Sequence, residues 1–596
     1  MRICHVEIEN FRNFRKLVLD LGDHAVIVGE NKIGKSNLIY ALRLVLDPRL
    51  SDAERQLRLE DFWDGLPRPL SKNDAIRISI DLTGFENDEN LMAVLAEHLV
   101  QAQPMISRFT YLYRPIPSLT RPPRKEADYE YIVFGGDRPE SLIGYETRQW
   151  IPLTLLPALR NAEEDLANWR QSPLAPLLRE VSANIDPDAL KKVADKVSNA
   201  TSAVAKLQEI NTLSELIRTS LQQTVGKSHA VDTALGFSPT EPDRLLRSLR
   251  LFIDGGKRSI GDASLGSANL IYLTLLSLNL KHQVENNSRY HTFLAIEEPE
   301  SHLHPHVQRL IFRDFLKMRF SSTTALPAPR PETVLLTTHS PHIVSVAPLK
   351  SIVVLHKSDD GLSTVGVSTA NLGLDDSTIS DLERYLDVSR GEIVFAKGVL
   401  LVEGPAEEFI IPVLARLRGY DFDQLGVTVC SVDGTNFAPY VLFLGKDGLN
   451  IPYAVLTDKD PVAKNKTLGN QRVGELLKII DSKFAAKTIS TANMLSEAQK
   501  RGIFLNDHTL EIDLFRCGQH QVMCNTLIEL TPNKAAVSRA LEWRDKPGTM
   551  DPKEFLKDIE AIGKGRYAQR LASSITGKAC PDYIVKAIKY VVKRLR

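Results

Sequence analysis

A glycine-rich segment near the start of the chain has the residue types that bind a nucleotide phosphate. Gly29-Glu30-Asn31-Lys32-Ile33-Gly34-Lys35-Ser36 fits the spacing G-x-x-x-x-G-K-[ST]. The glycines let backbone N–H groups wrap a phosphate, Lys35 reaches its outer oxygens, and the Ser36 hydroxyl can bind Mg²⁺. The apolar run His24–Val28 precedes the segment and helical spacing follows it over Ser36–Leu46. This context favours a nucleotide site over a chance match in a loop.

A second group of side chains suited to chemistry follows an apolar strand pattern far downstream. Phe293–Ile296 runs into Glu297 and Glu298. Beside a phosphate loop, the first carboxylate can hold Mg²⁺ and the second can orient the attacking water. A solvated strand end is the alternative interpretation. His339 ends a further strand pattern, and Ser264-Leu265-Gly266-Ser267 opens an apolar helix whose N-terminus could hold phosphate.

Carboxylates also gather after two strand patterns in the second half of the chain. Val399–Val402 runs into Glu403, with Glu407 one turn further on, and Ala454–Thr457 runs into Asp458-Lys459-Asp460. At the carboxyl edge of neighbouring parallel strands these side chains would converge. Four carboxylates repel one another unless divalent cations offset their charge, and oxygen ligands select Mg²⁺ or Mn²⁺. Two such ions can clamp both oxygens of a phosphodiester undergoing displacement.

The elements that must position these groups alternate along the chain. Residues 75–82 alternate strictly and predict a β-rich portion after the first helix, whereas helical spacing runs from 160 to about 223. A polar stretch at 371–381 precedes the second α/β pattern. We therefore predict an α/β protein with an ATPase-type domain at 1–160 and 245–372, a helical insertion at 161–244, and a second α/β domain at 373–596 with a helical extension.

The helical insertion carries a short apolar seam. Its members step by three and four residues over about three heptads: Leu190, Val193, Val197, Ala200, Val204 and Leu207. The seam is either the core face of a helical hairpin or a dimer contact, and its shortness favours the hairpin.

Composition excludes several classes of protein. The 596 residues are 43% hydrophobic and 25% charged, which is ordinary for a globular chain. Lys+Arg and Asp+Glu both number 74, so a protein coated in positive charge is excluded but a local basic channel is not. No stretch approaches the ~18 apolar residues of a membrane span, the start lacks a secretory signal, and five scattered cysteines make no disulfide framework. We expect a cytoplasmic protein without a membrane span.

Several segments together resemble the ATP-binding-cassette (ABC) ATPases of the SMC/RecF kind. These are the opening IENFRNF, the GxNxxGKSN loop with Asn31 and Asn37, the SLGS helix start, EEPESHLHP and TTHSP. The resemblance implies ATP and Mg²⁺ as cofactors, Glu297 as the Walker B carboxylate and Glu298 as the catalytic base. It also implies a switch histidine, His339, and a signature loop formed by Ser264, Gly266 and Ser267.

In that group the signature loop of one subunit completes the ATP site of the other, which implies a dimer. This chain lacks the usual double glycine in the signature, which implies slow hydrolysis, and Gln149 is the best candidate for the Q-loop glutamine.

The acidic motifs E-G-x-x-E and D-x-D, in this order after apolar strands, resemble a Toprim domain. An ABC ATPase joined to a Toprim domain resembles the OLD (overcoming lysogenization defect) nucleases, including Gabija-type defence nucleases, over essentially the whole chain. Thr509–Leu514 matches the family's "LExDL" stretch and implies Glu511 as a further metal ligand. Residues 562–568 resemble its "KGRFA" stretch and nominate Lys564 to neutralise transition-state charge on the phosphate.

The resemblance implies an ATP-regulated, Mg²⁺- or Mn²⁺-dependent DNA endonuclease or nickase, in DNA processing or anti-phage defence. It also implies a homodimer or higher homo-oligomer. The long spacing from Asp460 to Lys564 resembles class 2 members, which can work with a UvrD-like helicase. The alternatives are a non-cleaving RecF/SMC-like DNA-binding ATPase, a Toprim topoisomerase or primase, and a scaffold for a helicase.

Two other groups of side chains could suggest zinc, which is the less favoured interpretation because about four ligands of fitting geometry are needed. They are His302, His304 and His306, and Cys517, His520 and Cys524.

Overall fold

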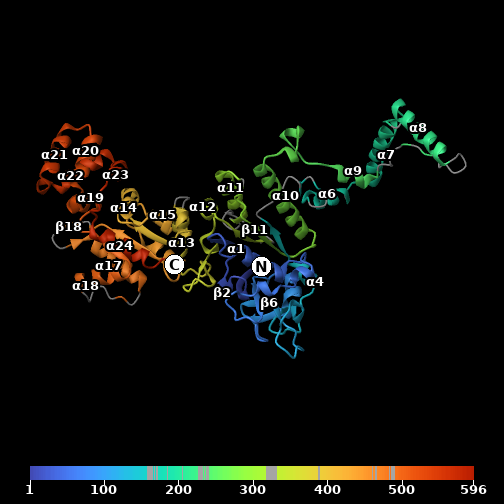
Figure 1. Ribbon diagram of the computed structural model, residues 1–596, viewed down its shortest axis with the longest axis horizontal. Helices are drawn as coiled ribbons and strands as arrows, with labels where there is room; N and C mark the ends of the chain where they lie inside the picture. Colours follow the sequence, from blue (N-terminus) through green and yellow to red (C-terminus); the bar gives the residue numbers. More distant parts are fainter. Residues whose placement is uncertain are drawn as a thin grey trace. The chain divides into compact units, whose positions relative to one another are not determined.

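The computed structural model describes residues 1–157, 165–166, 168, 172–183, 185–204, 206–225, 233, 235, 241–301, 303–316, 332–386, 390–459, 461–463, 466–481, 484 and 490–595 (Figure 1). Contacts divide the chain into two compact units. Unit 1 comprises Met1–Leu156, His291–Glu300 and Pro305–Arg596, and unit 2 comprises Pro157–Tyr290 and Ser301–His304. Unit 2 thus includes the helix that begins at the SLGS segment, which the sequence analysis assigns to the ATPase domain.

The first sheet of unit 1 is antiparallel, in the order β2-β1-β4-β6-β5, with β7 paired to β6. Its alternating apolar side chains form one buried face, and those of β4 at Ile76, Ile78, Ile80 and Leu82 are fully buried. The strands are β1 Arg2–Phe11, β2 Phe14–Asp20, β4 Ile76–Thr83, β5 Leu99–Ala102, β6 Met105–Pro115 and β7 Tyr129–Gly135.

The second sheet has the order β14-β13-β3-β12-β11-β8, and only β14 runs antiparallel to its neighbour. Its central strands are apolar on both faces, as expected for a sheet covered on both sides. Helix α1, Lys35–Leu46, packs against strands of both sheets, which explains why its buried residues surround the helix. The strands are β3 Ala25–Gly29, β8 Leu153–Leu156, β11 Thr292–Glu297, β12 Glu332–Thr337, β13 Ile352–Lys357 and β14 Thr364–Ser368.

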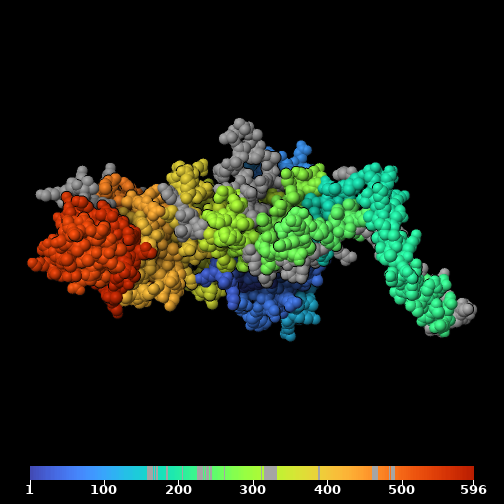
Figure 2. Space-filling view, turned by 90° about the horizontal axis from the view of Figure 1, so that it is seen from above, coloured from blue at the N-terminus to red at the C-terminus, as the bar shows by residue number. Residues whose placement is uncertain are grey.

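Unit 2 is mainly helical. Helix α7 packs against α9, and the seam predicted from the sequence is largely exposed: Val193, Val204 and Leu207 are 51%, 44% and 52% accessible. The seam therefore does not form a buried hairpin core among the described residues, and Figure 2 shows the region of α7 and α8 as a slender projection of unit 2. The elements are α6 Leu174–Ala183, α7 Pro187–Val204, α8 Gln208–Val225, α9 Pro242–Ser248, β9 Phe252–Ile253, β10 Arg258–Ser259 and α10 Leu265–Glu285.

The third main sheet is parallel throughout, in the order β16-β15-β17-β20. Helix α24 packs against β15, β17 and β20, and α17 packs against β20. The strands are β15 Gly398–Val402, β16 Val427–Ser431, β17 Tyr453–Thr457 and β20 Ile503–Leu505. The helices are α14 Pro405–Leu417, α16 Ala438–Leu444, α17 Leu468–Ile480, α18 Thr491–Lys500 and α24 Asp582–Val592.

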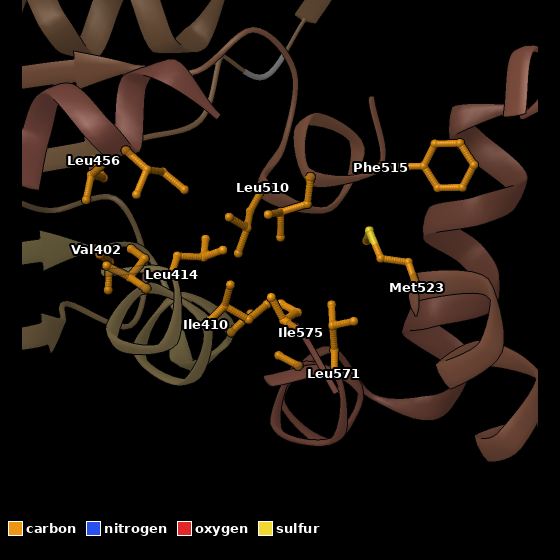
Figure 3. Close-up of a cluster of buried hydrophobic side chains, with 14 of the residues drawn as sticks. Val402, Ile410, Leu414, Leu456, Leu510, Phe515, Met523, Leu571 and Ile575 are labelled. Carbon is orange, nitrogen blue, oxygen red and sulfur yellow. The ribbon is translucent and has the colours of Figure 1, made fainter. Parts of the chain in front are cut away.

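A helical extension shares one hydrophobic core with this sheet (Figure 3). Leu456 on the sheet, Leu414 on α14, Leu510 on α19, Met523 on α20 and Leu571 on α23 all belong to it. Each fully buried leucine contributes roughly 2 kcal/mol, so this packing fixes α14, α19 and α23 against the sheet. The extension comprises α19 Leu510–Leu514, α20 His520–Leu530, α21 Lys534–Asp545, α22 Pro552–Ile562 and α23 Lys564–Ala572.

The polar stretch at 371–381 contains most of a helix, α13 Asp376–Tyr385. Asp375 caps it by accepting a hydrogen bond from the Thr378 N–H, and Leu382 on the helix is buried. The remaining described α-helices and strands are α2 Asp52–Arg55, α3 Glu89–Leu95, α4 Tyr145–Trp150, α11 Pro305–Leu316, α12 Pro341–Val344, α15 Phe422–Leu425, β18 Pro461–Ala463 and β19 Lys466–Thr467. In the described part of the chain, no helix combines the length and apolarity that crossing a bilayer requires. The predicted α/β fold class is confirmed.

Candidate functional site

The phosphate loop joins β3 to α1, as the sequence predicts. Gly34 has φ +108°, and a Cβ there would lie 2.1 Å from Nδ2 of Asn13, so only glycine fits. Asn13 donates to the Ile33 carbonyl at 2.7 Å and braces the loop from outside. Asn37 also contacts Asn13: its side chain accepts a hydrogen bond from Arg12 at 2.8 Å and donates one to Asn13 at 2.6 Å.

Lys35 is buried at the base of this loop. Its ammonium donates to the carbonyls of Gly29 and Glu30 at 3.0 and 3.1 Å and lies 2.8 Å from Nε2 of His339. Burial lowers the Lys35 pKa, and the charge of nearby Glu298 opposes that shift. Asn31 and Ser36 are exposed at the loop surface.

The structure brings Glu298 and His339 to the same edge of the sheet. Glu298 follows β11 and His339 follows β12, and these strands pair in parallel, with Glu297 opposite Thr337. The Glu298 carboxylate lies 3.5 Å from Nε2 of His339. Glu298 also has φ +41°, and its N–H donates to the Thr337 carbonyl at 2.9 Å. Lys35, Glu298 and His339 thus form one cluster.

Glu300 is a member of this site that the sequence analysis missed. Its carboxylate accepts from the His339 N–H at 2.6 Å and from Thr338 Oγ1 at 2.9 Å. It therefore holds the segment that carries the histidine. The only sequence signal was a third glutamate in E-E-P-E, which no spacing rule distinguishes from a surface residue.

The SLGS segment forms the start of α10 in unit 2. Ser264 caps the helix by accepting from the Ser267 N–H at 3.3 Å, and both serines are exposed while Gly266 is half-buried. Gln149 lies exposed on α4 in unit 1.

The second acidic site lies at the carboxyl edge of the parallel sheet. Glu403 follows β15 and Asp458 follows the neighbouring β17. One oxygen of Glu403, Oε1, accepts from Thr457 Oγ1 at 2.6 Å, from the Asp458 N–H at 2.8 Å and from Arg472 at 2.6 Å. The strand ends are therefore joined through the Glu403 side chain.

Asp458 has a partner of its own in Asn506, which follows β20. The Asn506 amide donates to Asp458 Oδ1 and accepts from the Lys459 N–H at 2.8 Å. Asn506 is buried, so this contact fixes the Asp458 carboxylate. Neither Asn506 nor Arg472 was predicted, since each comes from an element without a motif. Asp460 lies outside the described residues.

Glu407 and Glu511 bring further negative charge to this site. Burial, followed by the charges of Glu511 and Glu403, raises the pKa of Glu407 to about 7. Glu511 is 6% exposed at the start of α19. The second acid of the LExDL stretch has a different task, because Asp513 accepts from the backbone N–H groups of Asp507 and His508 at 2.9 and 3.2 Å.

Lys564 is the first residue of α23 and stands near these carboxylates. Burial lowers its pKa, but the charges of Glu511 and Glu560 outweigh burial, so its pKa is raised overall. Asp458 adds to the same effect. The Lys564 ammonium lies 3.5 Å from Oε1 of Glu560. A permanently charged ammonium beside an acidic site is suited to a phosphate oxygen.

The donor set suits divalent cations in chemistry and charge. Carboxylate oxygens are the ligands of Mg²⁺ and Mn²⁺, and such an ion would relieve the carboxylate repulsion that adds to the effect of burial on the Glu407 pKa. Within the described residues, which omit Asp460, no three His, Cys, Asp or Glu side chains are close enough to share an ion. Side chains would therefore have to turn toward a bound ion. The same finding covers Cys517, His520, Cys524, His304 and His306, while His302 lies outside the described residues.

These two sites define the class of protein: a P-loop ATPase joined to a Toprim-type domain. Residues 25–345 match the family described as "AAA domain, putative AbiEii toxin, Type IV TA system", and residues 394–460 match "Overcoming lysogenization defect protein-like, TOPRIM domain". The chain belongs to the OLD family.

Named relatives cover most of the chain. Endonuclease GajA of Bacillus cereus (strain VD045) is 23% identical over 80% of this chain and 78% of its own. The OLD nuclease of Thermus scotoductus is 23% identical over 76% of this chain and 81% of its own. The C-terminal region of the Xanthomonas campestris pv. campestris OLD protein is 39% identical over 34% of this chain and 96% of that chain, with a TM-score of 0.32.

Proposed function

We propose that this protein is an ATP-regulated, divalent-metal-dependent DNA endonuclease or nickase. The observation that carries the proposal is that Glu403 and the Asp458 N–H, at the ends of neighbouring parallel strands, are joined at 2.8 Å. The charges of Glu407, Glu511 and Lys564 act on the same site. Two relatives named as an endonuclease and a nuclease support it.

Cleavage would use these residues in different roles. Glu403, Glu407, Asp458, Asp460 and Glu511 would hold Mg²⁺ or Mn²⁺, which when bound supplies a more acidic water and offsets phosphate charge. Lys564 would donate to a scissile phosphate oxygen as negative charge builds there. Water adds to phosphorus and the 3′ oxygen leaves, so the products carry a 5′-phosphate.

ATP hydrolysis would use the first site. Lys35 and the backbone of Gly29–Gly34 would bind the phosphates, with Asn31 and Asn37 flanking them, and Ser36 and Glu297 would hold Mg²⁺. Glu298 would orient the attacking water, with His339 beside it. Ser264, Gly266 and Ser267 would complete the ATP site of a second subunit.

A direct contact within unit 1 supports regulation of the second site by the first. Lys397, immediately before β15, lies 2.8 Å from Glu30 of the phosphate loop. Helix α12, which starts just after His339, packs against the turn Arg390–Val394. Both ion-pair partners are about half exposed, so the pair contributes little stability. Its role would instead be to couple a movement of the phosphate loop to the start of β15.

The biological setting is part of the same proposal. The substrate would be DNA, the assembly a homodimer or higher homo-oligomer, a UvrD-like helicase a partner, and anti-phage defence or DNA processing the role. The exposed apolar seam on α7, at Val193 and Val204, supports self-association.

A topoisomerase reaction would need an activated tyrosine. Tyr583 on α24 shares a hydrogen bond with Asn506 beside Asp458. Burial and the charges of Asp458 and Asp513 raise its pKa well above the ordinary value. Its phenol therefore stays protonated near neutral pH, which disfavours Tyr583 as the nucleophile.

Supercoiled plasmid incubated with the purified protein, with Mg²⁺ or Mn²⁺ and with or without ATP, tests the proposal. Nicked or linear DNA with 5′-phosphate ends is expected from the wild type and not from Asp458→Ala. Relaxed closed circles would instead indicate a topoisomerase. Intact plasmid under every condition would leave a DNA-binding ATPase as the better account.

A further inference from the structure

Arg472 contacts the ends of two strands at the Toprim site, yet it belongs to no motif. It lies on α17 and donates to Glu403 Oε1 at 2.6 Å, to Thr457 Oγ1, and to the Asp458 carbonyl at 3.3 Å. The Arg472 and Glu403 side chains are only 13% and 18% exposed. A partly buried guanidinium thus joins the ends of β15 and β17, the two strands that precede Glu403 and Asp458.

The contacts of Glu403 divide unevenly between its two oxygens. Thr457, the Asp458 N–H and Arg472 all donate to Oε1. Among the hydrogen bonds of the described residues, none reaches Oε2 of Glu403. One oxygen is thus saturated and fixed, while the lone pairs of the other remain available.

We infer that Arg472 is a positioning residue that holds Glu403 by Oε1 so that Oε2 can bind a divalent cation. The inference rests on the proposed metal-dependent function. Carboxylates that bind metals are commonly held by hydrogen bonds from neighbouring groups, and loss of such a partner typically weakens metal affinity 10–100-fold. The fixed positive charge of Arg472 also offsets the charge of Glu403 before any ion binds.

A competing role for the same contact has the opposite consequence. If the guanidinium occupied the place of a cation, an ion would have to displace it, and removing Arg472 would tighten metal binding. If Arg472 only stabilised the fold, its loss would lower the melting temperature and leave the affinity of the folded protein for the ion unchanged. Metal affinity therefore separates the three roles.

The test is Mn²⁺ binding to the full-length protein, measured by calorimetry and by electron paramagnetic resonance. Arg472→Gln is expected to weaken Mn²⁺ binding at least tenfold, and Arg472→Lys to restore part of that loss. In a Glu403→Gln background, Arg472→Gln should cause little further loss, because its effect passes through Glu403. Arg416→Gln, a largely exposed arginine on α14, is the matched control and should bind Mn²⁺ like the wild type.

Each outcome bears on a different claim. Equal or tighter Mn²⁺ binding by folded Arg472→Gln overturns the positioning role. A full additional loss in the Glu403→Gln background shows that Arg472 acts by another route and also overturns it. Wild-type protein that binds no Mn²⁺ contradicts the proposed function itself. Should Arg472→Gln fail to fold, Arg472→Lys decides, because a shorter ammonium that cannot make all three contacts should still weaken binding measurably.

Discussion

The Lys35 ammonium lies 2.8 Å from Nε2 of His339, although 304 residues separate them in the chain. The contact exists because β3 and β12 are parallel neighbours, with Ala25 opposite Leu335. Their following loops therefore leave the sheet at the same edge. Because an ammonium can only donate, Nε2 is the acceptor in this contact.

Glu298 lies 3.5 Å from His339 in the same cluster. Glu298→Gln keeps the size of the side chain but removes the charge that would orient water, so ATP should still bind while hydrolysis falls roughly 100-fold. Phosphate release and binding of a fluorescent ATP analogue measure the two effects. Lys35→Ala should instead weaken binding itself. Wild-type hydrolysis by Glu298→Gln would contradict the assignment.

Glu300 should matter for hydrolysis although the EEPESHLHP stretch by itself assigned it no role. Glu300→Ala removes the acceptor of the His339 N–H and of Thr338 Oγ1. A hydrogen bond to a charged group contributes about 1.5–3 kcal/mol, so His339 should lose its fixed position and hydrolysis should slow at least tenfold. Steady-state phosphate release checks this. Glu86→Ala, an exposed glutamate, serves as the control, and equal rates for both variants would reject the role.

Removal of Asp458 and of Lys564 should affect DNA cleavage differently. Asp458→Ala loses a metal ligand, so cleavage should collapse and recover partly at high Mn²⁺. Lys564→Ala should slow cleavage about 100-fold, equivalent to ~3 kcal/mol, without changing Mn²⁺ affinity greatly. Both should keep DNA-independent ATP hydrolysis.

Lys534 is a matched control for Lys564, since each lysine is the first residue of a helix. Lys534→Ala should cut plasmid like the wild type. Wild-type cleavage by Asp458→Ala would place the nuclease elsewhere or in a contaminant.

The raised pKa of Glu407 predicts that the free energy of unfolding depends on pH. Its pKa rises from 4.5 to about 7 in the folded protein, so the folded state binds the extra proton between these values. In EDTA, the free energy of unfolding should therefore fall as pH rises from about 4.5 to 7, by at most roughly 3 kcal/mol. Mn²⁺ should oppose the loss at pH 7, because it favours the carboxylate.

Denaturant unfolding at several pH values measures this effect. Glu407→Gln should remove most of the pH-dependent change, whereas Glu408→Gln, at the neighbouring position, should retain it. An unchanged profile in Glu407→Gln would assign the effect to other groups.

The exposed seam predicts self-association through unit 2. Val193 and Val204 are 51% and 44% accessible, and a charge there would disfavour burial between subunits. Val197→Glu combined with Val204→Glu should shift the sedimentation coefficient toward that of a monomer. Leu541→Glu, at an exposed apolar residue of α21, should leave it unchanged. A wild type that is monomeric with full ATPase activity would contradict this prediction.

The local spacing of residues in the sequence was enough to predict several elements that carry the two sites. The phosphate loop, the strands before Glu297, Glu403 and Asp458, and the helix after Gly404 follow from short patterns of apolar, glycine and acidic residues, and the structure confirms those elements. The parallel convergence of Glu403 and Asp458 was also predictable, because both residues follow buried strands of an α/β pattern.

Tertiary structure alone decided which unremarkable residues support the sites. Arg472 and Asn506 reach their partners from segments whose local sequence has no special spacing, and Glu300, although it lies in the EEPESHLHP stretch, has a partner that only the fold reveals. The seam on α7 has the periodicity of a buried face, yet Val193 and Val204 are exposed. Periodicity records that a face is apolar, whereas the burial of that face and the partner of each polar group depend on the packing of distant elements.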